Sequence, residues 1–299
     1  MKKIFSTLLV VMCVVVAQAQ MVVAPKMEKG AKHVYKTNTV SKANGIEFTT
    51  VSTISYVVNE KTADGYVVTQ TMEDMSTSGG DENVRNMMSA TQKMLVKVPF
   101  VLKTDKNGQV VDLVNFNESK ATMIAKCNNI YDELIKANPM LSMQLTREAF
   151  IKQCESTMNV DALLQGIRGT AASVLTLNGK SINSGDTEEY LNSQGIKMKR
   201  TFIVSADRRQ IESKATSAMT LEETKAFVIE QVEKNAPAQA ATLKENIDKL
   251  VKTGMLKIDV KEDTRYLMKK DGWVDAIKYT QNMNLMGQTV SIETDITSM

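Results

Sequence analysis

Apolar and polar residues alternate along several segments of this 299-residue sequence, and this period is what most restricts the folds open to it. Residues 46–57 carry apolar side chains at four even positions: Ile46, Phe48, Ile54 and Tyr56. Successive side chains of a strand point to opposite faces, so the pattern predicts a strand with one buried face. The same period occurs in 66–75, in 186–219 and between 255 and 297. We therefore predict several amphipathic antiparallel strands.

Turn signals divide these segments into hairpins. Asp105-Lys106-Asn107-Gly108 lies between two apolar segments, which predicts strands near 94–103 and 109–115 joined by a tight turn. Further strands are predicted at 32–40 and, near the end of the chain, on both sides of the Asp271-Gly272 turn.

Other stretches have the 3.6-residue period of helices. We predict helices at about 118–137, 141–156 and 160–175. Thr220 and Glu223 have the spacing of a capping box, which predicts a further helix starting at this point.

The resulting order is sheet, helices, sheet, helix, sheet. Amphipathic strands separated by helices predict an α+β fold, in which one antiparallel sheet has helices packed on one face. No linker rich in proline, glycine or serine interrupts residues 20–299, so we expect them to form a single α+β domain.

The first 19 residues predict export. Two lysines precede a short apolar run from Leu8 to Ala17, and Ala17-Gln18-Ala19 fits the small-x-small cleavage pattern. We predict a signal peptide over residues 1–19, cleaved near Ala19/Gln20, and a periplasmic or secreted product. The run is shorter than the roughly 20 residues of a membrane span, so a retained anchor is the less favoured alternative. No stable membrane span is expected after cleavage.

Composition argues against several function classes. The chain has 37 basic and 34 acidic residues, and this near-balance does not suit a nucleic-acid surface, which requires clustered lysine and arginine. His33 is the only histidine, and we interpret it as a strand-edge residue rather than a catalytic base. The adjacent carboxylates at 73–74, 188–189 and 262–263 point to opposite faces of predicted strands, and we interpret them as solvated. We expect no enzymatic activity and no cofactor.

Twenty methionines raise the question of a Cu(I) site, because Cu(I) favours soft thioether ligands. Three pairs of methionines lie three residues apart: Met72/Met75, Met140/Met143 and Met283/Met286. The first and third pairs lie in predicted strands, where such residues point to opposite faces, and the second begins directly after Pro139. We therefore predict no metal site, and interpret the methionines as core residues or as an adaptable lining for a ligand.

Two cysteines remain after signal cleavage. Cys127 and Cys154 lie in predicted helices, at similar distances on either side of Asn138-Pro139-Met140. If these helices form an antiparallel hairpin, the thiols face each other, and an exported chain meets an oxidising environment. We hypothesise a Cys127–Cys154 disulfide, with two buried thiols as the alternative.

The order of elements and the closing hairpin DGWVDAIKYTQNMNLMGQTVSIETDI resemble those of uncharacterised exported bacterial proteins of a half-barrel type. These are similar in outline to periplasmic lipoprotein carriers. The resemblance implies a curved sheet that holds a helical lid, with an apolar gap that takes acyl chains. No diagnostic motif allows a residue role to be carried over.

Two functions follow as hypotheses. The first is an exported, non-enzymatic binding or carrier protein for an apolar, lipid-like small molecule. Its candidate ligand-lining residues are Phe48, Tyr66, Met72, Met198, Phe202, Trp273, Ile277, Tyr279 and Met283, with Ile46 on the same face. The second is a structural or protein-interaction module of the cell envelope, in which these residues form a dry core. A sizeable apolar cavity between sheet and helices would favour the first.

Overall fold

The computed structural model describes residues 20–80, 85, 92–137, 139–143, 145–168, 171–235, 237–253, 256–285 and 288–299. The predicted signal peptide and Met286 of the third methionine pair lie outside the described residues. Among the helices described, none combines the length and the apolar character that crossing a membrane requires.

Two groups of consecutive strands build one sheet. The first group is β2 (Lys32–Ala43), β3 (Ile46–Lys61), β4 (Gly65–Gly79), β5 (Pro99–Asp105) and β6 (Val110–Leu113). The second group is β8 (Thr187–Leu191), β9 (Lys197–Val204), β10 (Gln210–Ser217), β11 (Ile258–Met268), β12 (Val274–Leu285) and β13 (Gln288–Ser298). They form an 11-stranded antiparallel sheet in the order β6-β5-β4-β3-β2-β13-β12-β11-β10-β9-β8. A separate pair joins β1 (Met21–Val22) to β7 (Ser181–Ile182).

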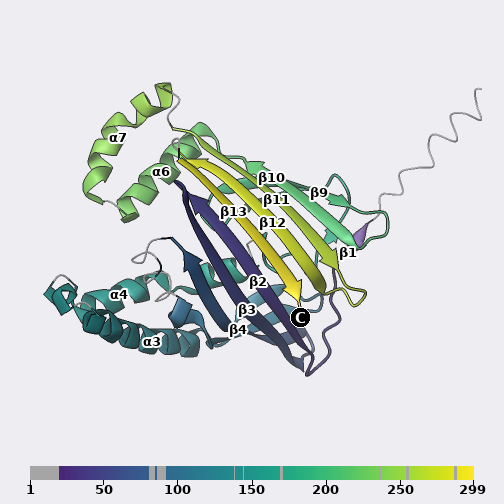
Figure 1. Ribbon diagram of the computed structural model, residues 1–299. Helices are drawn as coiled ribbons and strands as arrows, with labels where there is room; N and C mark the ends of the chain where they lie inside the picture. Colours follow the sequence, from purple (N-terminus) through teal and green to yellow (C-terminus); the bar gives the residue numbers. More distant parts are fainter. Residues whose placement is uncertain are drawn as a thin grey trace, which may run out of the picture.

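The two groups of strands meet where β2 pairs with β13, in the middle of the sheet (Figure 1). Tyr35 is opposite Ser298 and Ala43 is opposite Val290, so the pairing runs along almost the full length of both strands. One continuous sheet therefore joins β2, near the start of the described chain, to β13 at its end.

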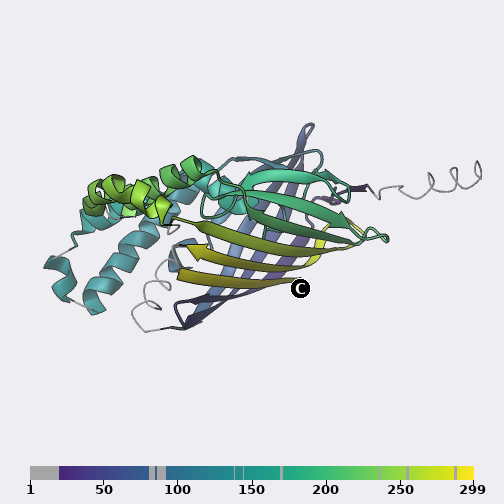
Figure 2. The same cartoon turned by 90° about the horizontal axis from the view of Figure 1, so that it is seen from above.

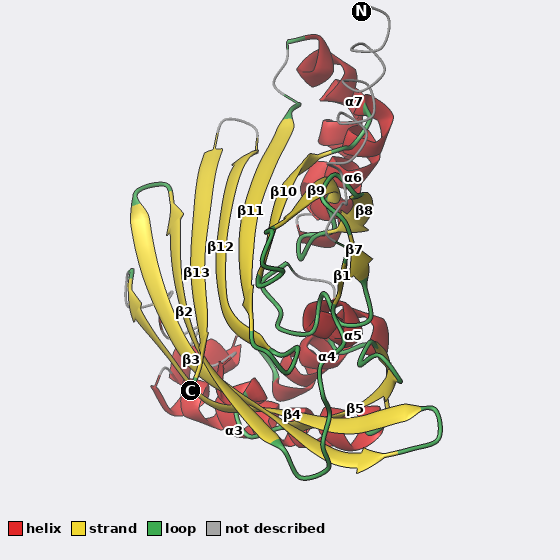
Figure 3. Cartoon of the chain, turned by 90° about the vertical axis from the view of Figure 1, so that its right-hand side faces the viewer, coloured by secondary structure: helices red, strands yellow, loops and turns green. Residues whose placement is uncertain are grey.

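The sheet curves around its inward-facing side chains, and α5 (Val160–Arg168) lies on the concave side (Figure 3). Register shifts interrupt the β3–β4, β5–β6 and β11–β12 pairs, and such bulges bend and twist a sheet. The sheet stays open, with β6 and β8 as its edges. The predicted α+β class with a curved antiparallel sheet is confirmed.

The remaining helices form two hairpins. The first consists of α3 (Phe116–Ala137), the 3-10 turn η1 (Pro139–Met143) and α4 (Arg147–Thr157), and the second of α6 (Leu221–Asn235) and α7 (Pro237–Lys252). Both hairpins lie at the same end of the sheet (Figure 2). Buried residues of α3 and α5 join the same core as inward-facing residues of the strands, and residues of α6 pack on two smaller clusters beside it.

Local sequence signals account for several boundaries. The amide of Thr220 donates to the Glu223 carboxylate at 2.7 Å, and the amide of Glu223 donates to the Thr220 hydroxyl at 3.2 Å, which confirms the capping box of α6. Gly108 closes the predicted β5–β6 turn with a φ of 82°, a conformation that glycine adopts without strain.

Three boundary predictions are wrong. β5 begins at Pro99 and not near 94, because residues 92–95 are helical and Lys97, with a φ of 62°, breaks the extended path. α4 begins only at Arg147, where Thr146 caps it by accepting from the amide of Ala149. α5 ends at Arg168, short of the predicted 175, and turns follow at 171–179.

The large core fills the concave side of the sheet. Its bulkiest fully buried side chains include Trp273, Tyr35, Tyr266 and Met123, which come from three strands or their ends and from α3. Ile46 does not join it, although its parity predicts an inward position. It is 42% exposed and is the first residue of β3, directly after the turn at Asn44 and Gly45.

Trp273 connects the N-terminal segment to the sheet. Its indole Nε1 donates to the carbonyl of Lys26 at 2.9 Å, and its ring stacks on that of His33 with centroids 3.8 Å apart. Burial lowers the pKa of His33 below its ordinary value of 6.5, against the attraction of Asp271 and with the help of Lys269. His33 is therefore neutral at neutral pH, as a half-buried member of this stack.

This arrangement predicts that acid weakens the fold through His33. Below pH 6.5 the unfolded chain binds a proton that the folded chain resists, so the free energy of unfolding falls as the pH falls from about 7.5 to about 5. His33→Phe keeps an aromatic ring on Trp273 but does not titrate, and its stability should depend less on pH. Urea unfolding of both proteins at the two pH values gives the change in the free energy of unfolding with pH. An equal change in the two proteins would contradict the prediction.

Candidate functional site

α5 bridges the two open edges of the sheet. The side chain of Gln165 donates to the carbonyl of Leu191 on β8 at 2.9 Å, and Nη1 of Arg168 donates to the carbonyl of Val110 on β6 at 3.0 Å. Edge strands present backbone groups without a neighbouring strand, and these side chains satisfy two of them. We call the region where α5 joins β6 and β8 the seam.

A cavity of about 280 Å³ lies at the seam. Its wall includes three cationic side chains, Arg168, Lys180 and Arg200, and one carboxylate, Glu188. Val110, Leu175, Leu191 and the ring of Tyr190 supply its apolar part. We call this space the seam cavity.

Arg200 is the most unusual residue in this wall. It lies on the inward face of β9 between Met198 and Phe202, and its side chain is only 2% exposed. Its guanidinium lies over the rings of Tyr190 and Phe202, with centroid distances of 4.6 and 4.8 Å, a favourable cation–π arrangement. Nη2 donates to Glu188 at 2.9 Å. Within the described part of the chain, Nε and Nη1 have no hydrogen-bond partner.

Glu188 forms ion pairs with two cations, Lys180 and Arg200. Nζ of Lys180 lies 2.5 and 2.8 Å from its two carboxylate oxygens, and Arg200 shares one of them. Burial raises the pKa of Glu188, but Arg200 and Lys180 together bring it below its ordinary value, so the group is ionised. Burial and Arg200 lower the pKa of Lys180. With Arg168, the wall carries three cations against one carboxylate, and such an excess attracts anions.

A second polar network holds Tyr190 in place. The Tyr190 hydroxyl donates to Glu262, a carboxylate in a residue that is only 2% exposed. The other oxygen of Glu262 accepts from Gln281 at 2.9 Å and from Asn192 at 3.3 Å. Burial and Glu262 raise the pKa of Tyr190, which keeps the phenol protonated as a donor. The network fixes the ring against which Arg200 packs.

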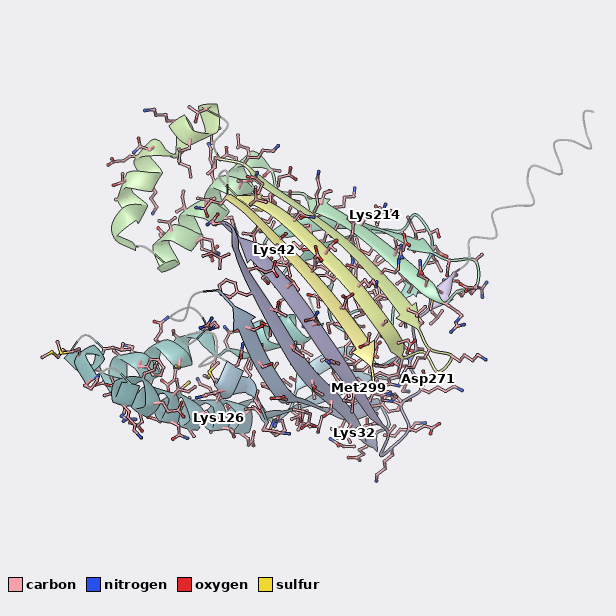
Figure 4. The ribbon with its side chains drawn as sticks, viewed as in Figure 1. Lys32, Lys42, Lys126, Lys214, Asp271 and Met299 are labelled. Atoms are coloured by element: carbon pink, nitrogen blue, oxygen red, sulfur yellow. The ribbon has the colours of Figure 1, made fainter. Side chains whose placement is uncertain are left out.

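Two other cavities fit a ligand site less well. The first, of about 450 Å³, lies beside the N-terminal segment and the Asp271-Gly272 turn, with Lys269, Lys270 and other cations on its wall. Asp271 lies at this end of the sheet, near the C-terminal Met299 (Figure 4). These cations lie in turns and loops at the surface.

The second lies between the concave face and residues 166–167 and 172–174, and the resemblance to lipoprotein carriers implies an apolar gap between sheet and helices. Its lining includes Tyr35, Tyr56, Ile167 and Val174, but its volume is only about 130 Å³. Ligand cavities usually measure roughly 300–1,000 Å³, so this space does not accommodate an acyl chain.

The nine residues predicted to line a ligand site do not converge on one cavity. Met198, Phe202, Trp273 and Ile277 are fully buried within the cores. Tyr66 and Tyr279 pack on the large core, and Met283 packs with Met198 in a smaller cluster. Phe48 and Met72 are half-buried on β3 and β4. None of the nine lines any of the cavities described above.

The predicted helical hairpin does bring Cys127 and Cys154 together. They lie on α3 and α4 as two free thiols close enough to interact. The disulfide itself stays a prediction. Met140 and Met143 lie exposed at the tip of this hairpin and do not form a pocket there. Across the described residues, histidine, cysteine, aspartate and glutamate side chains form no group of three that could hold a metal ion.

Sequence reasoning missed Arg200, Glu188 and Glu262. The interpretation of the carboxylate pairs as solvated is wrong for Glu262 and for the half-buried Glu188, although their neighbours Glu189 and Asp263 are exposed. A usable signal was present: Arg200 has the same parity as Met198 and Phe202. A charged residue at an inward position of an alternating strand indicates a buried polar site.

No protein-family model matches this sequence, and a search of curated proteins gives no match. Among solved structures, the chain is similar to lipovitellin, in a structure that describes lipid–protein interactions in that protein, with a TM-score of 0.40 and 6% identity. The alignment covers 92% of this chain and 25% of the other, so the chain spans about a quarter of the lipovitellin chain. A porin-like protein from Bacteroides uniformis is also similar, with a TM-score of 0.18, 9% identity and coverage of 93% and 98%.

Proposed function

We propose that this chain is an exported, non-enzymatic binding protein whose ligand is a small amphipathic anion held in the seam cavity. The observation that best supports this is Arg200, a buried cation with two nitrogens that lack a partner among the described residues. The predicted signal peptide supports export.

Burying Arg200 with two unpaired nitrogens costs free energy in two ways. Moving a charge out of water costs several kcal/mol, roughly, even after the protein relaxes. A buried donor without a partner costs about 1–3 kcal/mol more. A carboxylate or phosphate of a ligand accepts from guanidinium nitrogens in pairs, and these charge-assisted bonds are among the strongest in proteins. Nε and Nη1 of Arg200 are themselves buried, so such a ligand would offset both costs after a side-chain movement that brings one of them to the cavity.

The shape of the cavity limits the ligand's size. At about 280 Å³ it lies just below the usual range for ligand sites, so only a small ligand would fit. An anionic group would lie at Arg200 and Lys180, and a short apolar part would contact Leu175 and Val110. The concave-face cavity lies on the other side of α5, with Gly166 and Ile167 in its wall, so it does not extend the seam cavity.

One observation favours the alternative function, a structural or protein-interaction module of the cell envelope. Four of the predicted ligand-lining residues are buried side chains of a dry core, as a structural or protein-interaction module of the envelope requires. In that case the Arg200–Glu188 pair contributes only to packing and orientation within the core.

Native mass spectrometry of the chain purified from its own host tests the binding function. We expect an added mass that is released by unfolding and identified as a carboxylic acid or a phosphate ester. Added hexanoate or hexyl phosphate should stabilise the emptied protein by about 2.7 kcal/mol at a concentration of 100 times Kd. Hexanol, which has the same apolar part without the charge, serves as the control. No bound mass and no stabilisation by either anion would contradict the proposal.

Arg200→Met separates a binding role from a structural one. Glu188 keeps Lys180 as its partner, and an apolar side chain suits the space between Tyr190 and Phe202. Replacing a buried ion by an apolar residue is often neutral or stabilising by about 1–4 kcal/mol, so we expect unchanged or higher stability together with loss of anion binding.

The matched control is Lys214→Met, which removes an exposed cation from the neighbouring strand β10 (Figure 4). It should change neither property. If Arg200→Met unfolds more easily and still binds the anion, the structural function is favoured instead. Urea unfolding and isothermal titration with hexanoate measure the two properties.

A further inference from the structure

Three sulfur atoms meet where the first helical hairpin packs on the core. Cys127 on α3 is only 1% exposed, and its Sγ lies 3.4 Å from Sδ of Met94. The thiol of Cys154 on α4 lies close enough to the Cys127 thiol to interact with it. Cys154 and Met94 are half-buried and pack on the same core, so the cluster has a deep side and a side toward solvent.

The elements that carry these sulfurs are fastened to one another. Nζ of Lys126, beside Cys127 on α3 (Figure 4), donates to the carbonyls of Val96 and Lys93, which flank the helical turn of Met94. Arg147 at the start of α4 forms an ion pair with Asp132 on α3. The three sulfurs are therefore positioned by separate segments that side-chain contacts hold in place.

The donor set determines which ion would suit this place. Thiolates and thioethers are soft ligands and select Cu(I). Structural zinc requires four ligands, usually cysteine and histidine. Among the described residues, no histidine, further cysteine or carboxylate joins Cys127 and Cys154 to form such a group. Three sulfurs at metal–sulfur bonds of roughly 2.3 Å would lie about 4 Å apart, so the observed contact needs only a small expansion.

We propose that Met94, Cys127 and Cys154 form a three-sulfur site for Cu(I). Binding replaces the two S–H bonds by two copper–thiolate bonds and adds one thioether bond, and the two protons pass to solvent. Copper stays Cu(I) throughout and no sulfur is oxidised. The site differs from the three methionine pairs, because it combines one methionine with two cysteines from other segments.

Both cysteines must lose their protons to bind the ion, and the positive charge of Cu(I) favours this deprotonation. Copper uptake should therefore weaken as the pH falls. A Cys127–Cys154 disulfide, which we hypothesise from the sequence, would remove both thiolates, so the two states exclude each other.

The test uses the full chain, reduced and handled without oxygen, and titrates it with Cu(I) against the chromophoric chelator bicinchoninate. We expect the protein to hold one Cu(I) per chain, with about two protons released, and X-ray absorption to show sulfur ligands at roughly 2.3 Å. Cys154→Ser should abolish binding, and Met94→Leu should weaken it roughly 10-fold or more, as expected for loss of a direct ligand.

Met140→Leu is the matched control, because it removes an exposed methionine from the tip of the same hairpin and should leave the affinity unchanged. Thermal unfolding confirms that each variant is folded. Failure of the reduced chain to compete with bicinchoninate would overturn the proposal. Equal affinity of Met94→Leu and the unmodified chain would do the same, as would a native disulfide whose reduction gives no copper uptake.

Discussion

The pairing of β2 with β13 is the interaction on which the rest of the structure depends. It joins segments from opposite ends of the chain: the hydroxyls of Thr39 and Thr294 lie 3.1 Å apart although the residues are 255 positions apart in sequence. Neither group of strands alone has enough breadth to surround the core. Once joined, they form a curved sheet whose two free edges, β6 and β8, belong to the middle of the chain. Because closing so long a loop costs entropy before any contact forms, we expect this pairing to form late in folding.

The β2–β13 pairing also explains why the polar site lies at the seam. A curved sheet buries its concave face, and α5 and the segment after it cover that face between the two edges. Carbonyls on β6 and β8 then accept from side chains of α5 instead of from another strand. Polar groups are concentrated here because edges leave backbone groups to satisfy. Arg200, Glu188 and Glu262 lie on strands at this side of the sheet.

Patterns local in sequence predicted most of the elements. Alternation identified β3, β4 and β9, and the Thr220–Glu223 pair and the Asp105–Gly108 turn marked ends of elements correctly, because each depends on contacts between neighbours in sequence. Strand order was not accessible, since the β2–β13 pairing depends on contacts between distant residues. Arg200 was missed for another reason: a charged side chain was not expected to share a face with Met198 and Phe202. Burial of such a residue depends on Glu188 and Tyr190, which come from another strand.

The way α5 is attached to the sheet edges differs from the way the strands are attached to one another. Gln165 and Arg168 each hold a sheet edge through a side-chain hydrogen bond, whereas the strands hold one another through backbone ladders. Displacing α5 would leave every pair of strands in place, but it would also remove Leu164 and Ile167 from the large core. The seam is therefore held by two side-chain hydrogen bonds and by core packing, and not by a strand ladder.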